Sequence, residues 1–333
     1  MPRRRLSERQ VQRIRAIQDR RRRRLEERTP DVLAQLDDTE PRPGRVVVRH
    51  GSHLAVEDAL GGVFHCLTRR HIGHPVCGDR VVWLSTGDGS GVVTALQPRE
   101  TALSRPDYSG RDKPLAANIS LIVIVVAPRP APSGYLIDQY LAAAELIGVQ
   151  ALILANKMDL VNGEERAGFL ARLAHYQPIG YPLLAVSVKQ DPTLAALTPH
   201  LSGQTAILLG QSGVGKSSLI KALLPDQEVQ IGRLSKATGL GRHTTSATTC
   251  YRLGNGGYLI DSPGVRSFRL GNIDRDQLAR GFREFAPYVG HCRFADCRHL
   301  QEPDCAIRAA LDAGDIAPQR LDNFQHLAAQ IKP

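Results

Sequence analysis

The 333-residue sequence lacks both a long apolar run and an apolar stretch near its N-terminus. A membrane-spanning helix needs roughly 18 or more consecutive apolar residues, whereas the longest apolar stretch here, residues 121–127, suits a buried strand. A secretory signal peptide is disfavoured in the same way, because its central segment must be apolar. We therefore expect a cytoplasmic protein with no membrane contact.

Cysteine is also scarce, with six residues, and a cytoplasmic location argues against disulfide bonds. Cys66, Cys77 and Cys250 lie scattered among strand-like segments, so we expect them to be small apolar core residues. The other three cysteines lie within fourteen residues of one another near the C-terminus, and this clustering requires a separate explanation.

Positive charge is unevenly distributed along the chain, whose formal net charge is +10. Residues 1–28 contain twelve arginines, no lysine and four acidic residues, so most of the excess lies in this N-terminal arm. Such a segment repels itself and favours polyanions, because binding to phosphates releases their counterions. We expect the arm, residues 1–43, to contact nucleic acid; a solvated helix or a disordered tail is the alternative.

Five short β-like runs follow the arm in a predicted domain that spans residues 44–103. They are separated by turns rich in glycine and aspartate, and they occupy residues 45–50, 53–57, 62–67, 79–84 and 91–96. Five strands in a segment of about 60 residues suit a small closed barrel. An OB-fold is the first expectation, and an SH3-like barrel fits nearly as well.

The pattern then changes, and residues 104–271 are expected to form an α/β domain. Strand-like runs alternate with helical segments, and the run at 119–127 is apolar and β-branched, as in a strand buried on both faces. The other runs lie at 151–155, 183–186, 206–209 and 258–260. This alternation is typical of a mostly parallel sheet. Residues 272–333 are expected to be mostly helical, and the sequence contains no internal repeat.

The strongest motif is a phosphate-binding loop with the pattern G-x4-G-K-S. It follows a predicted strand and precedes a helical segment, which is the context that the motif requires. Its backbone N–H groups and the helix N-terminus bind phosphates, and we expect Lys216 to reach the β- and γ-phosphates and Ser217 to bind Mg²⁺. The expected nucleotide contacts are Gly210, Gln211, Ser212, Gly213, Val214, Gly215, Lys216, Ser217 and Ser218. A chance glycine-rich turn is the alternative.

A base-reading tetrapeptide follows the predicted strand 151–155 and consists of Asn156, Lys157, Met158 and Asp159. In GTP-binding proteins the carboxylate of this pattern accepts hydrogen bonds from the guanine N1–H and exocyclic amine, a donor pair that adenine lacks. We expect Asp159 to read guanine, Asn156 to hold the loop and touch the base edge, and Lys157 to pack over the ring. Taken alone, the tetrapeptide would also suit a polar turn.

The order of these motifs is reversed relative to most GTP-binding domains, in which the phosphate loop comes first. The tetrapeptide at 156–159 precedes the loop at 210–217, as in a circularly permuted GTPase. Between them, Ser187 and Lys189 follow another predicted strand and resemble the loop that supports the base from its other side.

Two further segments fit the switches of a GTPase. Residues 261–264 read D-S-P-G, in which Asp261 is expected to hold Mg²⁺ through water and the Gly264 N–H to sense the γ-phosphate. Between this motif and the phosphate loop, Thr244 and Thr245 are both candidates for the Mg²⁺-binding threonine of switch I, and Thr245 is preferred.

Val265 follows this motif where Ras-like enzymes place the glutamine that orients the attacking water. Valine cannot hydrogen-bond water, so we expect slow intrinsic hydrolysis that rises when a partner orders the site. His243 is the nearest substitute, because an imidazole can orient or deprotonate water at neutral pH; an exposed histidine without a role is the alternative. The expected catalytic residues are thus His243, Lys216 and Thr245.

The C-terminal cysteines form the pattern C-x4-C-x-H-x5-C. Three thiolates and one imidazole suit tetrahedral Zn²⁺, and four protein ligands leave no open position, so we expect one structural zinc ion. The ligands would be Cys292, Cys297, His299 and Cys305. The alternatives are three reduced core cysteines, which fit poorly with the polar surrounding sequence, and His291 as a competing ligand.

Together these ordered motifs resemble the bacterial ribosome small-subunit-dependent GTPase A family over residues 44–330. The features that carry the resemblance are G-R-H-T-T at 241–245, D-S-P-G-V at 261–265 and the cysteine–histidine pattern. The resemblance implies a multidomain chain with an N-terminal five-stranded β-barrel of the OB-fold, a circularly permuted α/β P-loop GTPase domain and a C-terminal, mostly helical zinc-binding domain. It also implies a monomeric GTP hydrolase, with GTP or GDP, Mg²⁺ and Zn²⁺ bound. Such a hydrolase would act late in maturation of the 30S ribosomal subunit, bind 16S rRNA and be stimulated by the subunit.

Two other functions share these motifs. One is a GTP-regulated RNA-binding module with little productive turnover, and the other is a GTPase that serves translation initiation or messenger binding.

The motif order also suggests a hypothesis about movement. The C-terminal domain follows the second switch directly, whereas the barrel joins through 119–127, close in sequence to the base reader. We therefore expect the orientation of the C-terminal domain on RNA to change between the GTP-bound and GDP-bound forms. The barrel is expected to keep a more constant position.

Overall fold

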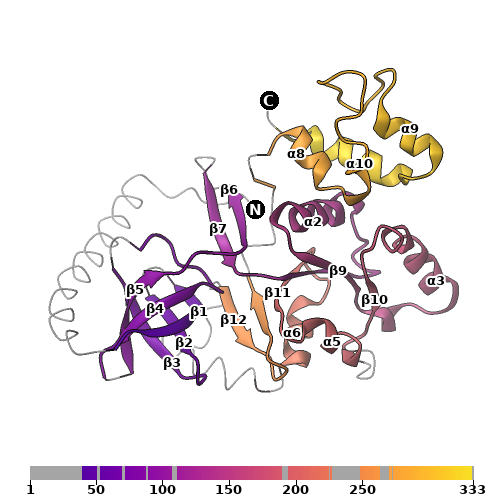
Figure 1. Cartoon of the computed structure of the whole chain (residues 1–333). Helices are drawn as coiled ribbons and strands as arrows, with labels where there is room; N and C mark the ends of the chain where they lie inside the picture. The colour runs from indigo at the N-terminus through magenta and orange to yellow at the C-terminus, as the bar shows by residue number, and fades with distance from the viewer. Residues whose placement is uncertain are drawn as a thin grey trace, which may run out of the picture.

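The computed structural model describes residues 40–50, 53–69, 72–87, 89–106, 111–189, 194–224, 226, 248–262, 270–271 and 273–331. Most of the arginine-rich arm lies outside these residues. So do the candidate switch residues Thr244, Thr245, His243, Gly264 and Val265. The described ranges form a barrel, an α/β region and a helical region, in that order along the chain (Figure 1).

The N-terminal strands close into a five-stranded barrel. They are β1 (Arg42–His50), β2 (His53–Asp58), β3 (Val63–Thr68), β4 (Arg80–Ser85) and β5 (Ser90–Leu96). Their order is β1-β2-β3-β5-β4, and β4 pairs with β1 to close the ring. Trp83 is fully buried in the barrel core. The prediction of a five-stranded OB-type barrel is confirmed.

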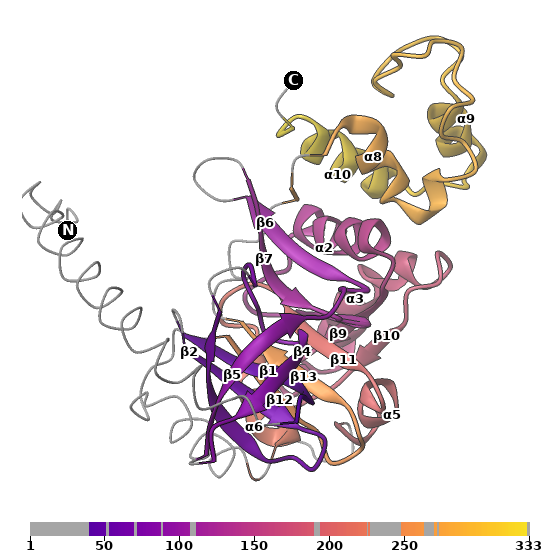
Figure 2. The same ribbon diagram turned by 60° about the vertical axis from the view of Figure 1, so that its left-hand side comes forward.

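A separate antiparallel hairpin follows the barrel, and the sequence patterns did not predict it. It consists of β6 (Ala102–Pro106) and β7 (Asp112–Ala117), and a bridge between Cys77 and Ala116 joins it to the barrel. In Figure 2 the hairpin extends away from the barrel towards the helical region.

The central sheet contains five parallel strands and one antiparallel edge strand. In spatial order they are β10 (Leu183–Ala185), β9 (Gln150–Ala155), β8 (Leu121–Val126), β11 (Thr205–Leu209), β13 (Tyr258–Asp261) and the antiparallel β12 (Thr248–Arg252). Every residue of β8 is buried, as its apolar sequence predicts for a central strand. The α/β prediction is confirmed, although β12 was not foreseen.

Helices flank this sheet. The longest, α2 (Gly134–Ile147), lies on one side, and α6 (Lys216–Leu223) lies on the other (Figure 1). The other helical elements of this region are η1 (Met158–Leu160), α3 (Gly163–Ala171), η2 (Ala174–Tyr176) and α5 (Thr198–Leu201). No helix within the described ranges is both long and apolar enough to cross a membrane.

The barrel and the central sheet share one continuous ladder of hydrogen bonds. Strand β1 pairs with the edge strand β12, so that Val48 lies opposite Thr249 and Arg49 lies opposite Thr248. The two sheets therefore form a single 11-stranded sheet. The base-reading strand β9 lies near the far end of this sheet, although it is close to the barrel in sequence.

The first and last helices of the C-terminal region pack against α2. It contains α8 (Arg275–Arg280), η4 (Arg283–Phe285), α9 (Ala306–Ala313) and α10 (Pro318–Ala328). Its core includes three aromatic rings in mutual contact, Phe282, Phe285 and Phe324. The buried cysteines Cys66, Cys77 and Cys250 belong to the cores of the other two regions, as predicted.

Candidate nucleotide site and metal centre

The phosphate loop connects β11 to α6, and two of its glycines have conformations that other residues would strain. Gly210 has a φ of 142°, and a Cβ there would lie 2.2 Å from the Val125 carbonyl oxygen. Gly215 has a φ of 96°, and a Cβ there would lie 2.5 Å from the Asn156 Nδ2. Both positions therefore require glycine. The loop leads directly into the N-terminus of α6, where backbone N–H groups point outward.

The Lys216 ammonium group lies over this loop. Its Nζ donates to the carbonyl oxygens of Gly210, at 2.6 Å, and Gln211, at 2.7 Å. The loop and the first turn of α6 enclose a hollow of about 260 Å³, which is lined by Lys157, Ser212, Gly213, Gly215, Lys216, Ser217 and Ser218. The predicted phosphate-binding residues thus surround one polar cavity at a helix N-terminus, which suits an anion.

The base-reading loop is fastened to the phosphate loop by two side chains. Asn156 donates from Nδ2 to the Val214 carbonyl oxygen at 2.9 Å, and Lys157 donates from Nζ to the Gly213 carbonyl oxygen at 2.5 Å. The Asn156 Oδ1 is buried and has no hydrogen-bond partner within the described part of the chain. Two motifs far apart in sequence therefore lie in contact in the fold.

Asp159 is held as an ionised acceptor beside this site. Ser187 donates from Oγ to Asp159 Oδ1 at 2.6 Å, and Lys189 Nζ lies 3.3 Å from Oδ2. The Ser187 hydrogen bond is the main reason why the pKa of the Asp159 carboxyl lies below its usual value, and Lys189 lowers it further. A carboxylate has about four lone-pair positions, so it can accept further donors from a base.

Asp261 ends β13 at the same edge of the sheet as the phosphate loop, because β11 and β13 are parallel. The next residue, Ser262, is buried, and its Oγ lies 3.1 Å from Thr248 Oγ1. The remaining predicted residues of this part of the site, His243, Thr245 and Gly264, lie outside the described residues.

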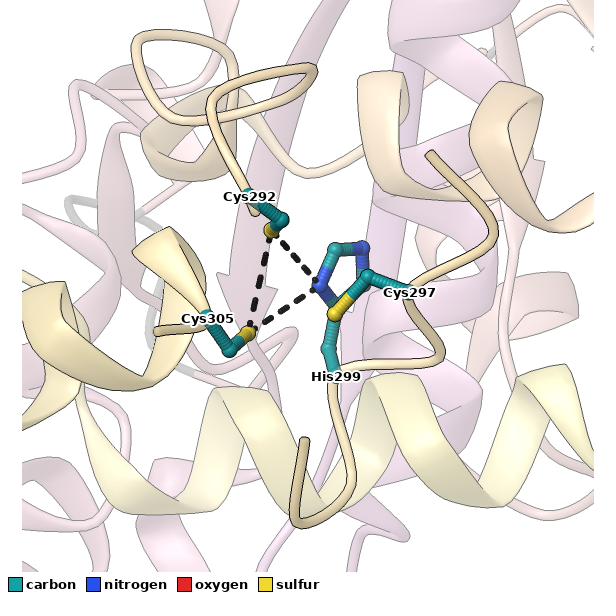
Figure 3. A group of neighbouring side chains, drawn as sticks. All are labelled: Cys292, Cys297, His299 and Cys305. Carbon is teal, nitrogen blue, oxygen red and sulfur yellow. Dashed lines mark hydrogen bonds between the residues drawn. The ribbon is translucent and has the colours of Figure 1, made fainter. Parts of the chain in front are cut away.

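The C-terminal cysteines and His299 converge on one point (Figure 3). Their candidate ligand atoms all lie within 4.8 Å of one another. Cys292 Sγ lies 3.8 Å from Cys305 Sγ and 3.5 Å from His299 Nδ1, which in turn lies 3.3 Å from Cys305 Sγ. Tetrahedral zinc with bonds of about 2.3 Å to sulfur separates two sulfur ligands by about 3.8 Å. The geometry therefore fits Zn²⁺ bound through Nδ1.

The chemistry of these groups also fits a metal. Burial raises the pKa of the Cys297 thiol to about 12, so without a cation the sulfur would stay protonated. Burial lowers the pKa of His299, which keeps the imidazole neutral and able to act as a ligand. A divalent cation would stabilise the thiolates that burial otherwise disfavours.

Removing zinc should increase local unfolding of the segment 291–305, while α8 and α10 stay packed against α2. The ion pairs with α2 are made by Arg283 and Arg320 rather than by the four ligands, so we expect amide protection to fall mainly in this segment after chelation or in Cys297→Ser. Hydrogen exchange would measure this. Cys250→Ser, at a buried cysteine far from the cluster, is the control. Native protein should contain about one equivalent of zinc, and less than about half an equivalent would contradict the assignment.

Comparison with known proteins identifies the family. The sequence model of the RsgA GTPase family matches residues 96–271. The chain belongs to the RsgA GTPase family. A relative from Azotobacter vinelandii, named small ribosomal subunit biogenesis GTPase RsgA, is 45% identical over 99% of this chain and 98% of its own length.

Two solved structures agree with the RsgA assignment. YjeQ from Thermotoga maritima superimposes with a TM-score of 0.71 and 29% identity, covering 88% of this chain and 99% of that chain. YloQ, described as a circularly permuted GTPase, gives a TM-score of 0.69 and 26% identity, covering 88% of this chain and 97% of its own. The chain is thus a GTP hydrolase of the RsgA family, with GTP or GDP and Mg²⁺ as ligands, and the prediction from the reversed motif order is confirmed.

The sequence patterns missed two groups of residues that adjoin the RsgA site. The hydroxyl groups of Thr248 and Ser262 lie in contact next to Asp261. The two threonines that begin β12 could have predicted a strand at Thr248, because β-branched residues favour strands. Tyr140 on α2 is buried, and the backbone N–H of Gly210 donates to its hydroxyl. A tyrosine within an apolar helix carries no local sign of contact with a phosphate loop.

Proposed function

We propose that this chain hydrolyses GTP during late maturation of the 30S ribosomal subunit, that it binds 16S rRNA, and that the subunit stimulates it. The names of the RsgA relatives support the ribosomal role. The observation that carries the proposal is the joining of the base-reading and phosphate loops into one site in a chain of this family. We further propose that it acts in the cytoplasm as a monomer.

The nucleotide would be held by groups from both loops. We assign guanine reading to Asp159, supported by Ser187 and Lys189, because its ionised oxygens can accept the paired donors of guanine. The N-terminus of α6 and Lys216 would bind the phosphates, and Lys216 would exchange its loop carbonyls for phosphate oxygens.

Mg²⁺ would be held by Ser217 at the start of α6, by Asp261 through water and by Thr245. When bound, the ion neutralises charge that develops on the phosphate oxygens. His243 is our candidate for orienting the attacking water, with the Gly264 N–H sensing the γ-phosphate. The N-terminal arginines and a net charge of +10 suit contact with rRNA phosphates.

Multiple-turnover GTP hydrolysis should rise roughly tenfold or more when purified 30S subunits are added, which is a coupling of ordinary size. The stimulation should fall steeply between about 50 and 200 mM salt, because phosphate contacts release counterions. Phosphate release would be measured with 30S subunits and, as the control, 50S subunits. Lys216→Ala should lose hydrolysis in every condition.

Other outcomes would replace the proposal. GTP binding without turnover, alone and with 30S subunits, would favour a GTP-regulated RNA-binding module. Equal stimulation by immature and mature subunits would contradict a role in maturation and favour a GTPase that serves translation. Single-turnover rates of His243→Ala, with and without subunits, test the water-orienting role, and unchanged rates would remove it.

A further inference from the structure

The barrel contacts the GTPase region at the edge that carries the proposed Mg²⁺-binding strand. Strand β1 pairs with β12 through two residue pairs, and β12 pairs in turn with β13, which ends in Asp261. A second set of barrel contacts lies at the opposite end of β13. The Tyr258 hydroxyl donates to Glu57 Oε2 at 2.9 Å, and the Arg45 guanidinium lies 4.2 Å from the centre of the Tyr258 ring. The barrel therefore contacts β13 directly at Tyr258 and reaches the Asp261 end of the strand through β12.

The backbone position of the last residue of β13 is fixed by pairing with β12 rather than with β11, the strand that precedes the phosphate loop. The register between β11 and β13 runs from Thr205 opposite Tyr258 to Ile207 opposite Ile260. The register between β12 and β13 extends one residue further and places Thr249 opposite Asp261. The position of the Asp261 backbone is thus set mainly by β12.

Thr248 joins the barrel to this strand end. Its carbonyl oxygen accepts from the Cys77 thiol of the barrel at 3.1 Å, and its backbone pairs with Arg49 of β1. Its hydroxyl lies 3.1 Å from the hydroxyl of the buried Ser262. Successive strand residues point to opposite faces of a sheet, so this hydroxyl pair lies on the face opposite to the Asp261 side chain. It can act on Asp261 only through the backbone.

We propose that the barrel positions Asp261 for Mg²⁺ binding through β12, and that Thr248 and Ser262 are the positioning residues that lock this strand end. The inference rests on the proposed function in one respect, namely that Asp261 serves the metal. It identifies a physical route by which a partner that contacts the barrel would change GTP hydrolysis. A small shift of β1 moves β12, and through it the group that holds the metal's water.

Thr248→Val and Ser262→Ala should each raise the Mg²⁺ concentration that half-saturates intrinsic GTP hydrolysis, by about threefold to tenfold, since each removes one hydrogen bond. The double variant should be no worse than the more affected single variant, because both changes break the same contact. Thr248→Ser keeps the hydroxyl and should restore values close to those of the unmodified chain.

The control is Thr94→Val, which removes a hydroxyl that donates to the Val82 carbonyl oxygen inside the barrel at 3.2 Å. It should leave the Mg²⁺ dependence unchanged. A purely structural role for Thr248 would lower the melting temperature and leave the Mg²⁺ dependence as it was, and this result would overturn the inference. Additive effects in the double variant would overturn the pairing of the two hydroxyls.

Cys77→Ala removes the thiol that donates to Thr248 from the barrel side, and should raise the half-saturating Mg²⁺ concentration in the same direction by about twofold to fivefold. No change would limit the positioning effect to β12 and overturn the part assigned to the barrel. Asp261→Asn separates this inference from the proposed function. If it leaves the Mg²⁺ dependence unchanged, the proposed role of Asp261 fails, and the inference fails with it. If it shifts that dependence while Thr248→Val does not, only the inference fails.

Discussion

Replacing Asp159 with asparagine is expected to transfer the base preference from guanine to xanthine. The carboxylate accepts from both N1–H and the exocyclic amine of guanine, and the amide retains only one acceptor. Each hydrogen bond to a charged group contributes about 1.5–3 kcal/mol, so kcat/KM for GTP should fall by about 10-fold to 150-fold. Xanthine has a carbonyl in place of the amine, and the new amide N–H₂ would donate to it.

The neighbours of Asp159 allow this exchange. Ser187 donates to Oδ1, which an asparagine oxygen can replace, and the exposed Lys189 can move away from the new amide. Hydrolysis of GTP, XTP and ATP would be compared in both chains, with Asp312→Asn on the exposed side of α9 as the matched control. Loss of GTP hydrolysis without a gain for XTP would show that Asp159 supports the loop rather than reads the base.

Replacing Arg320 with methionine should destabilise the C-terminal region by about 3–5 kcal/mol, which is the usual cost of removing one member of a buried ion pair. Arg320 is fully buried. Its Nη1 lies 2.6 Å from the Asp138 Oδ1 of α2, and its Nε and Nη2 donate to Glu284 at 2.5 and 3.0 Å. Asp138 is also fully buried and accepts from the Tyr176 hydroxyl and the Asn323 amide, both at 2.7 Å. Without Arg320 two acidic groups would remain buried without a counter-charge.

The loss caused by Arg320→Met should also depend on pH. Burial raises the pKa of Asp138 above its usual value even with Arg320 present, and removing the guanidinium raises it further. A carboxyl whose pKa is higher in the folded state contributes stability at low pH and loses it as pH rises through that pKa. The destabilisation should therefore be larger at pH 8 than at pH 5.

Chemical denaturation, followed by hydrogen exchange in α8 and α10, would measure both effects of the Arg320 variant. The control is Arg293→Met, which breaks an exposed pair with Asp304 at 3.0 Å and should cost less than about 1 kcal/mol. Equal losses in the two variants would mean that the buried contacts do not dock the C-terminal region onto α2.

The nucleotide and zinc sites could be predicted from sequence because their residues lie in short motifs with fixed local roles. The glycines of the phosphate loop and the cysteine spacing at 292–305 each specify a turn and a ligand set without reference to the rest of the chain. The apolar run at β8 likewise determines its own burial. Each of these features can be recognised within about fourteen consecutive residues of the sequence.

The contacts between regions were not predictable in the same way. The pairing of Arg49 with Thr248 joins residues about 200 positions apart, and no local pattern in either strand selects the other. Asp138 lies in the mostly apolar helix α2 and Arg320 in the mostly polar helix α10, and their burial becomes visible only when the two helices pack together. The barrel joins the GTPase region through residues 119–127, close in sequence to the base-reading loop, but in the fold β1 pairs with the opposite edge of the central sheet.

The hypothesis that the GTP state moves the C-terminal domain stays a prediction, but the docking contacts restrict how it can move. Asp138 and Glu145 of α2 bind Arg320 and Arg283 of the C-terminal region. The same helix carries Tyr140, which accepts from the Gly210 backbone N–H. A movement of the C-terminal domain that keeps these contacts must carry α2 with it and must act on the phosphate loop.

The ladder between β1 and β12 also determines where the chain can be divided. The sequence suggests a boundary near residue 103, between a barrel and a GTPase domain. In the folded molecule β1 pairs with the outer edge of β12, which would otherwise be the edge of the central sheet. A GTPase fragment cut at that boundary would present a row of unpaired backbone N–H and C=O groups, the kind of edge that promotes aggregation. The smallest unit of this chain that protects its own catalytic sheet therefore includes the barrel.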